Sequence, residues 1–175
     1  NVETLAAATG ILLNGAEKFS SVGNKKSAGT KLVCLDSFFN NPGVYEIDMG
    51  TPMKKIFEEY GGGYKEDVKA FQIGGPLGGV VPISEIEKLN LDFQEFTKAG
   101  FMLGHASVVS IPKDFNMAEY IHHLFEFSAE ESCGKCFPGR IGSYRGKEMF
   151  DQLKKGTSKI PLKLLNELLV TMQKG

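Results

Sequence analysis

Residues 30–48 read TKLVCLDSFFNNPGVYEID, and this stretch carries the clearest fold signal in the chain. Two apolar runs, KLVCL and VYEI, are separated by a segment that ends in Asn, Asn, Pro and Gly. Short apolar runs joined by turn-forming residues predict the two strands of a β-hairpin. Cys34 lies in the first run among apolar neighbours, so we expect it to be a small, buried and unreactive residue.

A helix is predicted directly after the hairpin, in TPMKKIFEEYGGG at residues 51–63. Thr51 suits the N-cap, Pro52 the first helical position and Gly61 the residue that ends the helix. We expect this helix to cross the sheet that the hairpin begins. Its inner face is expected to carry Ile56, Phe57 and Tyr60.

Further strands are predicted after this helix. VKAFQI at residues 68–73 reads as one strand, and FMLGHASVVSI at residues 101–111 as one or two more. Between them, GGPLGG at residues 74–79 fits neither the dinucleotide nor the Walker pattern, so a turn is favoured over a phosphate loop. A hairpin, a crossing helix and returning strands are the order expected of a small β-grasp (ubiquitin-like) unit, which we place at residues 29–113.

The residues before the hairpin predict one helix and a linker. Asn1 is available as an N-cap, and the helical period stops at Gly23. We therefore separate residues 1–28 from the unit that follows. The apolar face of this helix is expected to carry Leu5, Ala8, Leu12, Ala16 and Phe19.

Three amphipathic helices are predicted from residue 114 onward. In the first, Asn116 and Glu119 form a capping box; the second lies around residues 147–156, and the third opens at Pro161. Their apolar stripes need one another for burial, which predicts a small helical bundle at residues 114–175 and an α+β class for the whole chain. The residues expected to face inward are Met117, Tyr120, Ile121, Leu124 and Phe125 in the first helix and Leu162, Leu165, Leu168, Leu169 and Met172 in the third.

Composition excludes several classes of protein. The 175 residues carry 20 Lys and Arg against 21 Asp and Glu, so the charge offers no case for binding nucleic acid or an anionic membrane surface. No apolar run reaches membrane-spanning length, and the first residues do not read as a secretion signal. Three cysteines are too few for a disulfide scaffold and favour a cytoplasmic protein. The missing initiator Met suggests processing or a cut from a longer chain.

The candidate site is a pair of thiols in ESCGKCFPGR, residues 131–140. Cys133 and Cys136 are three residues apart in a turn that contains Gly and Pro, which allows both sulfurs to face one point. This spacing serves zinc, iron–sulfur clusters and redox disulfides, and the residues alone leave these alternatives open. A third cysteine at position 139 would complete the C-x-x-C-x-x-C run of a cluster loop, but Gly139 stands there.

The charged residues around the pair have simpler interpretations beside the functional ones. His122 and His123 lie near glutamates on the predicted helix, so we expect solvated surface histidines rather than zinc ligands. Arg140 and Arg145 follow the thiols, and each is either a cation that stabilises thiolates or an ordinary surface arginine. His105 stands alone, and no nucleophile motif is present in the sequence.

The order of NVETL, GAEKF, GTKLVCL, NNPGVYEI, GGPLGG and ESCGKCFPGR resembles one family over essentially the whole chain. It is similar to the C-terminal half of the flavoprotein, NADH-oxidising subunit of respiratory complex I. The same module occurs as the diaphorase subunit of NAD-reducing hydrogenases and NAD-linked formate dehydrogenases. The resemblance implies a β-grasp unit of the soluble-ligand-binding type and, at residues 1–28, the helical end of a flavin- and NADH-binding domain.

The resemblance also implies site residues and cofactors. Asn1 and Thr4 match positions that contact FMN, and the whole protein would use FMN and NAD. Cys133 and Cys136 match two ligands of a 4Fe–4S cluster, with Arg140 as a nearby cation. The third ligand position is Gly139, and the fourth ligand would lie beyond Gly175. We therefore expect this chain by itself to hold no intact cluster and to oxidise no NADH.

The implied function is electron transfer from NADH through FMN to an iron–sulfur cluster. Expected partners are the other electron-transfer subunits of a multisubunit complex, including one with a 2Fe–2S cluster, with no nucleic acid and no direct membrane insertion. We expect the protein to lie in the cytoplasm, in the peripheral arm of a membrane complex or in a soluble complex. The alternative is a non-catalytic docking or ligand-binding module with a vestigial or zinc-binding thiol pair. The final electron acceptor is left open.

Overall fold

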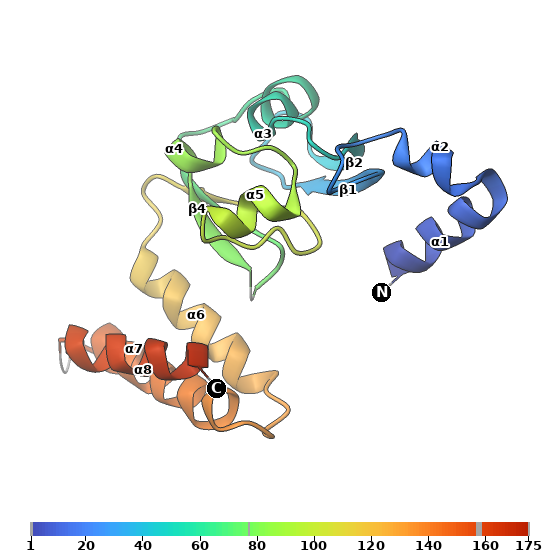
Figure 1. Cartoon of the computed structure of the whole chain (residues 1–175). Coiled ribbons are helices and arrows are strands. Elements are labelled where there is room, and N and C mark those ends of the chain that lie inside the picture. The colour runs from blue at the N-terminus through green and yellow to red at the C-terminus, as the bar shows by residue number, and fades with distance from the viewer. Residues whose placement is uncertain (1, 77, 157–158, 175) are drawn as a thin grey trace. The chain divides into compact units, whose positions relative to one another are not determined.

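The computed structural model describes residues 2–76, 78–156 and 159–174. The chain divides into two compact units, Asn1–Lys113 and Asp114–Gly175 (Figure 1). The first unit is built around a five-stranded sheet, and the second consists of helices. This combination confirms the predicted α+β class. Within the described ranges, no helix has the length and apolar character needed to cross a membrane.

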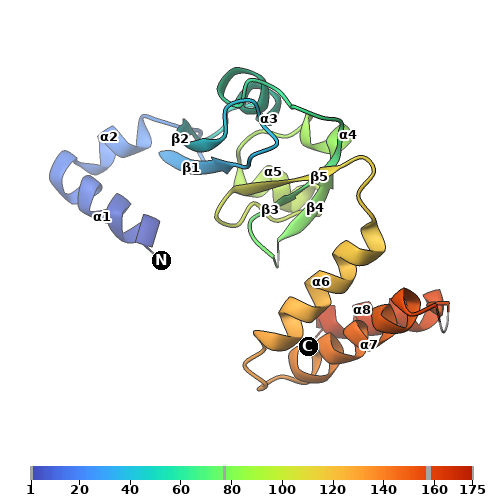
Figure 2. The same cartoon turned by 180° about the vertical axis from the view of Figure 1, so that it is seen from behind.

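The sheet joins two antiparallel hairpins through one parallel contact. Its strand order is β2-β1-β5-β3-β4 (Figure 2). β1 pairs antiparallel with β2 and parallel with β5, while β3 pairs antiparallel with both β4 and β5. The predicted hairpin and the predicted strand at residues 68–73 are confirmed. The strands are β1 Thr30–Leu35, β2 Gly43–Asp48, β3 Val68–Ile73, β4 Gly79–Pro82 and β5 Ser107–Pro112.

Short helices surround this sheet in the first unit. The helix expected over the first residues is broken at Gly15, whose φ of 90° ends the helical conformation and starts a second helix. Its expected apolar face is wrong, since Leu5 and Leu12 are 69% and 87% exposed. The helices are α1 Val2–Asn14, α2 Ala16–Ser20, α3 Met53–Lys55, the π-helix η1 Ile56–Tyr60, α4 Ile83–Ile86 and α5 Phe93–Lys98.

The crossing helix after the hairpin is confirmed, with two corrections. Pro52 takes the N-cap position of α3, while the hydroxyl of Thr51 donates to the carbonyl of Asp48 instead of capping the helix. Tyr60 is 38% exposed, because it lies at the end of η1 and stacks edge-on with Tyr45 at the surface. The inward face therefore consists of Ile56 and Phe57, both fully buried.

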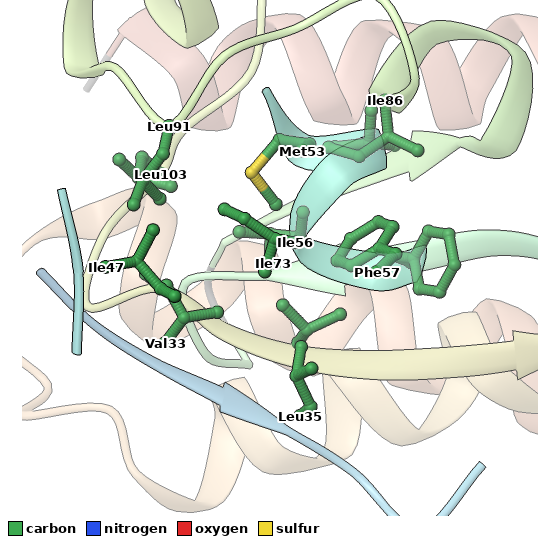
Figure 3. Close-up of a cluster of buried hydrophobic side chains, with 14 of the residues drawn as sticks. Val33, Leu35, Ile47, Met53, Ile56, Phe57, Ile73, Ile86, Leu91 and Leu103 are labelled. Atoms are coloured by element: carbon green, nitrogen blue, oxygen red, sulfur yellow. The ribbon is translucent and has the colours of Figure 1, made fainter. Parts of the chain in front are cut away.

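The core lies on one face of the sheet. Side chains alternate along β1, so Val33 and Leu35 point toward Ile56 and Phe57 of η1, as Figure 3 shows. The same alternation turns Cys34 to the opposite, exposed face, and the prediction that Cys34 is buried is wrong. The rest of the core is aromatic and aliphatic: Phe39, Ile47, Met53, Phe71, Ile73, Val81, Ile86, Leu91, Phe96, Leu103 and Val108.

Two aspartates connect distant segments of the first unit. Asp36, directly after β1, accepts hydrogen bonds from the backbone N–H and the hydroxyl of Ser110 in β5, at 2.6 and 3.0 Å. Asp92 caps α5 by accepting from the backbone N–H groups of Gln94 and Glu95, and it also accepts from the side-chain amide of Asn24 at 2.6 Å. Asp92 therefore ties the segment before β1 to a helix that lies 68 residues later in the chain.

The second unit consists of α6 Met117–Glu130, the π-helix η2 Pro138–Gly142, α7 Ser143–Lys154 and α8 Leu162–Lys174. Close packing uses two glycines: a Cβ at Gly146 would lie 2.2 Å from the ring of Phe125 in α6, and one at Gly142 would lie 2.8 Å from Met172 in α8. The three predicted helices are present. The inward assignment is wrong for Leu162 and Leu169, which are 78% and 46% exposed.

The cap of α6 is confirmed in part. The side chain of Asn116 accepts a hydrogen bond from the backbone N–H of Ala118 at 2.9 Å, as an N-cap residue does. The bond goes to the second helical residue rather than to Glu119, the third, where a capping box would place it. α6 therefore begins where the sequence predicts, with a simpler cap.

We predict that Asp92 makes the first unit sensitive to acid. Burial alone would raise the pKa of Asp92, but hydrogen bonds from Asn24 and from the backbone of α5 outweigh it and lower that pKa. The resulting stability is present above the pKa of an unfolded aspartate, about 3.9, and is lost as the pH falls through the lower folded-state pKa. Urea unfolding of the first unit, followed by tyrosine fluorescence at several pH values, measures this loss.

Two substitutions of Asp92 distinguish the effect of its charge on stability from the effect of its N-cap hydrogen bonds. Asp92→Asn keeps an oxygen at the N-cap but removes the charge, so it should flatten the acid dependence and should lose at neutral pH the stability that comes from the ionised carboxylate. Asp92→Ala removes the cap as well and should cost about 1 kcal/mol at neutral pH. An unchanged acid dependence in Asp92→Asn would show that another group controls it.

Candidate functional site

The thiol pair lies in the loop between α6 and η2. Gly134 has a φ of 72°, which lets the chain turn between the two cysteines. Phe137 already has helical dihedral angles, and η2 continues without a break into α7. Cys136 therefore stands immediately before a long helical segment, and both Cys133 and Cys136 are exposed, as expected.

Backbone amides organise this loop. The hydroxyl of Ser132 accepts a hydrogen bond from the N–H of Gly134 at 3.2 Å. The sulfur of Cys136 accepts one from the N–H of Gly139 at 3.4 Å, and the carbonyl of Cys136 accepts one from the N–H of Arg140 at 3.0 Å. An N–H group directed at sulfur complements the negative charge of a metal-bound sulfur at that position.

A side chain at position 139 would be directed at the sulfur of Cys136. A Cβ built at this position would be 3.0 Å from the Cys136 sulfur and 3.4 Å from the Ser132 hydroxyl oxygen. Gly139 lies in η2 and is not among the glycines with positive φ. The backbone at 139 is therefore one that a cysteine adopts without strain, and its side chain would be directed at the thiol site.

The residues present do not fit a complete 4Fe–4S cluster. Such clusters are held by four ligands, predominantly cysteine thiolates, and this loop supplies Cys133 and Cys136. Among the described residues, no three His, Cys, Asp or Glu side chains gather where they could hold a metal ion. In the part of the chain that the structure describes, the loop therefore supplies two thiol donors.

The two arginines beside the loop have different surroundings. The guanidinium of Arg140 lies over the ring of Phe137, with its central carbon 5.7 Å from the ring centroid. Arg145 donates to the carboxylate of Glu148 at 2.8 Å, one helical turn further along α7. Arg145 is therefore paired within its own helix, and Arg140 is the cation held at the loop.

Of the two histidines predicted to be solvated at the surface, His122 and His123, the prediction is confirmed for one. His123 is exposed, as expected. His122 is not solvated: its side chain is 12% exposed, and its Nε2 lies 2.8 Å from Oδ1 of Asp151 in α7. Its hydrogen bond outweighs the opposing effect of desolvation and lowers the pKa of Asp151. This pair joins α6 to α7 and lies apart from the thiols in the sequence, so we assign it a structural role.

Asn1, one of the two predicted flavin contacts, lies outside the described residues. Thr4 is exposed on α1. α1, α2 and the edge of the sheet enclose a hollow of about 500 Å³, lined by residues that include Ala6, Ala7, Ile11, Phe19 and Leu32. Thr4 does not line this hollow, whereas its neighbour Glu3 does.

Glu3 is a residue that sequence reasoning missed. Its carboxylate forms an ion pair with Lys31 and accepts a hydrogen bond from the backbone N–H of Leu32 at 3.0 Å. Burial would raise the pKa of Glu3, but these two groups outweigh it and lower that pKa. Glu3 and Lys31 lie 28 residues apart, so no local pattern could have predicted the contact.

The glycine-rich segment that begins at Gly74 follows β3 and leads to β4, which begins at Gly79, so it connects two strands as predicted. Gly74 and Gly75 have φ values of 88° and 97°, which explains the need for glycine there. A Cβ at Gly75 would lie 2.8 Å from the ring of His105, whose Nε2 is 3.2 Å from the hydroxyl of Ser107. Leu77 of this segment lies outside the described residues.

Comparison with known proteins finds one family. Residues 119–175 match the model of the NADH-ubiquinone oxidoreductase-F iron-sulfur binding region. The chain is 41% identical over 144 residues to an F-type subunit of the NADH-quinone oxidoreductase of Rhizobium meliloti, covering 81% of this chain and 34% of that protein. It is 34% identical over 158 residues to NADP-reducing hydrogenase subunit HndC of Solidesulfovibrio fructosivorans, covering 89% of this chain and 32% of that protein.

Solved structures agree with these relatives. The chain matches the crystal structure of an NAD+-reducing NiFe-hydrogenase in the H2-reduced state with a TM-score of 0.82 and 27% identity, covering 97% of this chain and 28% of that chain. The chain spans about a third of the length of the curated relatives it matches.

We predict that a thiol reagent modifies all three cysteines of the folded protein quickly. Cys34 is exposed on the free face of β1, and Cys133 and Cys136 are exposed in their loop. Mass spectrometry after a short reaction with iodoacetamide, without denaturant, counts the modified thiols. The variant Cys34→Ser is the control and should show two modified thiols instead of three. Modification of two thiols in the unmutated protein would show that the free face of β1 is covered.

Proposed function

Residues 119–175 belong to the iron–sulfur binding region family of NADH-ubiquinone oxidoreductase F, which confirms the predicted resemblance, and we propose that the chain serves electron transfer in such a flavoprotein subunit. In the whole protein, electrons would pass from NADH by way of FMN toward the cluster region. The single observation that carries this proposal is the loop at residues 132–140, in which the N–H of Gly139 donates to the sulfur of Cys136 at the start of a helix in the matched region.

We assign three parts to the chain within this function. Residues 1–28 form the helical end of a flavin- and NADH-binding domain, residues 29–113 a β-grasp domain, and residues 114–175 a helical bundle that carries the cysteine loop. The strand order β2-β1-β5-β3-β4, with the α3–η1 segment following the first hairpin, supports the β-grasp assignment. The packing of α6 and α8 against the η2–α7 segment at Gly146 and Gly142 supports the bundle.

The proposed site residues follow from these parts. Cys133 and Cys136 are the metal-ligating residues, and Arg140, held at the loop by Phe137, is a cation that stabilises negative charge on them. Asn1 and Thr4 are the proposed FMN contacts. Support for Thr4 is its exposed position on α1.

The proposed partners are other electron-transfer subunits of a multisubunit complex, including one with a 2Fe–2S cluster. Support comes from the names of the relatives, which are subunits of an NADH-quinone oxidoreductase and of an NADP-reducing hydrogenase. We place the protein in the cytoplasm, in the peripheral arm of a membrane complex or in a soluble complex. The choice of final acceptor differs between these relatives and stays open.

A second candidate function is a non-catalytic docking or ligand-binding module. The hollow of about 500 Å³ beneath α1 and α2 is the observation in its favour, because its apolar lining suits a ligand or a partner side chain. The two functions differ in what position 139 does. In an electron-transfer subunit this position is a ligand position, and in the alternative it has no role.

We predict that Gly139→Cys, in a chain extended to include a fourth cysteine, takes up a 4Fe–4S cluster under anaerobic reconstitution. The Cβ of this cysteine would lie 3.0 Å from the Cys136 sulfur, so that sulfur must shift by a few tenths of an ångström, while the backbone at 139 does not have positive φ. Iron and sulfide content and visible absorbance measure the uptake, compared with the same extended chain that retains Gly139.

A matched control places the added cysteine elsewhere. Gly10 also lies in a helix, and a Cβ there meets nothing within 4 Å, so Gly10→Cys adds a thiol without strain. In the extended chain, Gly10→Cys should leave iron content at the level of the unsubstituted extended chain. Equal iron content in the Gly139→Cys and Gly10→Cys proteins would exclude position 139 as a ligand position and would favour the second candidate function.

A further inference from the structure

Glu3 connects the start of α1 to the sheet. Its carboxylate forms an ion pair with the ammonium group of Lys31 and accepts a hydrogen bond from the backbone N–H of Leu32 at 3.0 Å. Both partners belong to β1. We infer that Glu3 is a positioning residue for FMN, because it fixes the first turn of α1 on β1 and thereby sets the orientation of Thr4. This inference rests on the proposed function, in which Thr4 contacts FMN.

Glu3 and Thr4 lie on different sides of α1. Successive side chains of an α-helix are turned by about 100° around its axis, so neighbouring residues do not face the same way. Glu3 lines the hollow between α1 and the sheet, whereas Thr4 is exposed and does not line it. An anchor at Glu3 on one side of the helix therefore determines the direction in which Thr4 points on another.

Burial does little to fix the position of α1. None of its residues, Val2–Asn14, is buried, and Val2 and Leu5 are 85% and 69% exposed. Most of the stability of a helix in a protein comes from packing an apolar face against its neighbours. The contacts of Glu3 therefore matter more for the position of the first turn of α1 than they would in a well-packed helix.

Lys31 makes this anchor specific. It occupies one of the buried positions in the alternation of β1, and 8% of its side chain is exposed. A buried ammonium group is costly unless a carboxylate pairs with it, and Glu3 is that carboxylate. The strand itself therefore favours the arrangement in which the start of α1 lies on it.

The charge of Glu3 is retained at neutral pH. Burial would raise the pKa of Glu3, but hydrogen bonds from Leu32 and Lys31 outweigh it and lower that pKa. The charges of Lys31 and of His105, which lies before β5, act in the same direction. The ion pair is therefore intact under the conditions in which a flavin would bind.

The test uses the whole protein that contains this chain, prepared without FMN. The change in flavin fluorescence on binding measures its dissociation constant for FMN. Glu3→Ala removes the ion pair and the hydrogen bond, and it should weaken FMN binding about tenfold, as the loss of one or two hydrogen bonds would. Glu3→Gln keeps an oxygen for the N–H of Leu32 and should weaken FMN binding less.

A double substitution distinguishes positioning from an independent contribution to binding. If Glu3 acts by orienting Thr4, its loss matters less once the Thr4 side chain has been removed. Thr4→Ala should weaken FMN binding by itself. Glu3→Ala/Thr4→Ala should then weaken FMN binding by less than the product of the two single losses, whereas residues that act independently would give the product.

Two further variants control for the fold. Glu3→Ala/Lys31→Met removes the unpaired charge together with the anchor, so it should recover thermal stability lost in Glu3→Ala while FMN binding stays weak. Glu46→Gln is the matched control. Glu46 lies on β2 and lines the same hollow, but it accepts a hydrogen bond from the hydroxyl of Thr30 at 2.7 Å and does not anchor α1. Its substitution should leave FMN binding unchanged.

Several results would overturn the inference while the whole protein still binds FMN, and the proposed function would then stand. They are an unchanged dissociation constant in Glu3→Ala, independent losses in Glu3→Ala/Thr4→Ala, recovery of FMN binding together with stability in Glu3→Ala/Lys31→Met, or an equal loss in Glu46→Gln. An unsubstituted whole protein that binds no FMN, or an unchanged dissociation constant in Thr4→Ala, would overturn the proposed FMN contact and this inference with it.

Discussion

The parallel pairing of β1 with β5 is the contact on which the first unit depends. It places Cys34 opposite Ser107 and Leu35 opposite Val108, and thereby joins two antiparallel hairpins into one sheet. Val33, Leu35 and Val108 then line the same buried face. Asp36 reinforces the pairing by accepting two hydrogen bonds from Ser110, 74 residues later in the chain. When β1 pairs with β5, the chain between them becomes a closed loop. This loop contains the crossing helix and its aromatic core, and its conformational freedom is reduced.

In the second unit, helix packing fixes the segment that follows the thiol loop. The segment from Pro138 to Lys154 is fixed from two sides, by Phe125 of α6 against Gly146 and by Met172 of α8 against Gly142. Either glycine leaves room for a neighbouring side chain that a larger residue would exclude. A Cβ at position 139 would contact Cys136 and Ser132 of the same loop and neither neighbouring helix. A change of side chain at this position therefore leaves the helix packing intact.

Sequence patterns predicted the elements with long or strongly alternating apolar runs. The hairpin, the crossing helix, the strand at residues 68–73 and the three C-terminal helices follow from such patterns. α4 and α5 were not predicted, because helices of four and six residues are too short to establish a period. Cys34 was misplaced because KLVCL is apolar on both faces, and a continuous apolar run does not indicate which face is buried.

Contacts between distant residues were beyond the reach of sequence patterns. The pair His122 and Asp151 and the pair Glu3 and Lys31 each join segments about 30 residues apart. The thiol pair was found because its spacing is local. The conformation of Gly139 could not be predicted, because glycine adopts positive and negative φ about equally well.

We expect residues 1–175 by themselves to hold no complete 4Fe–4S cluster, because the loop at residues 132–140 supplies two thiols and such a cluster takes four ligands. Native mass spectrometry of the chain, expressed in iron-replete cells and purified without oxygen, tests it most directly. We expect a mass equal to that of the polypeptide, alone or with one bound metal ion. A mass increased by four irons and four sulfides would contradict it, because a complete cluster would then be held by two cysteines of the loop and by ligands that the described residues do not bring together.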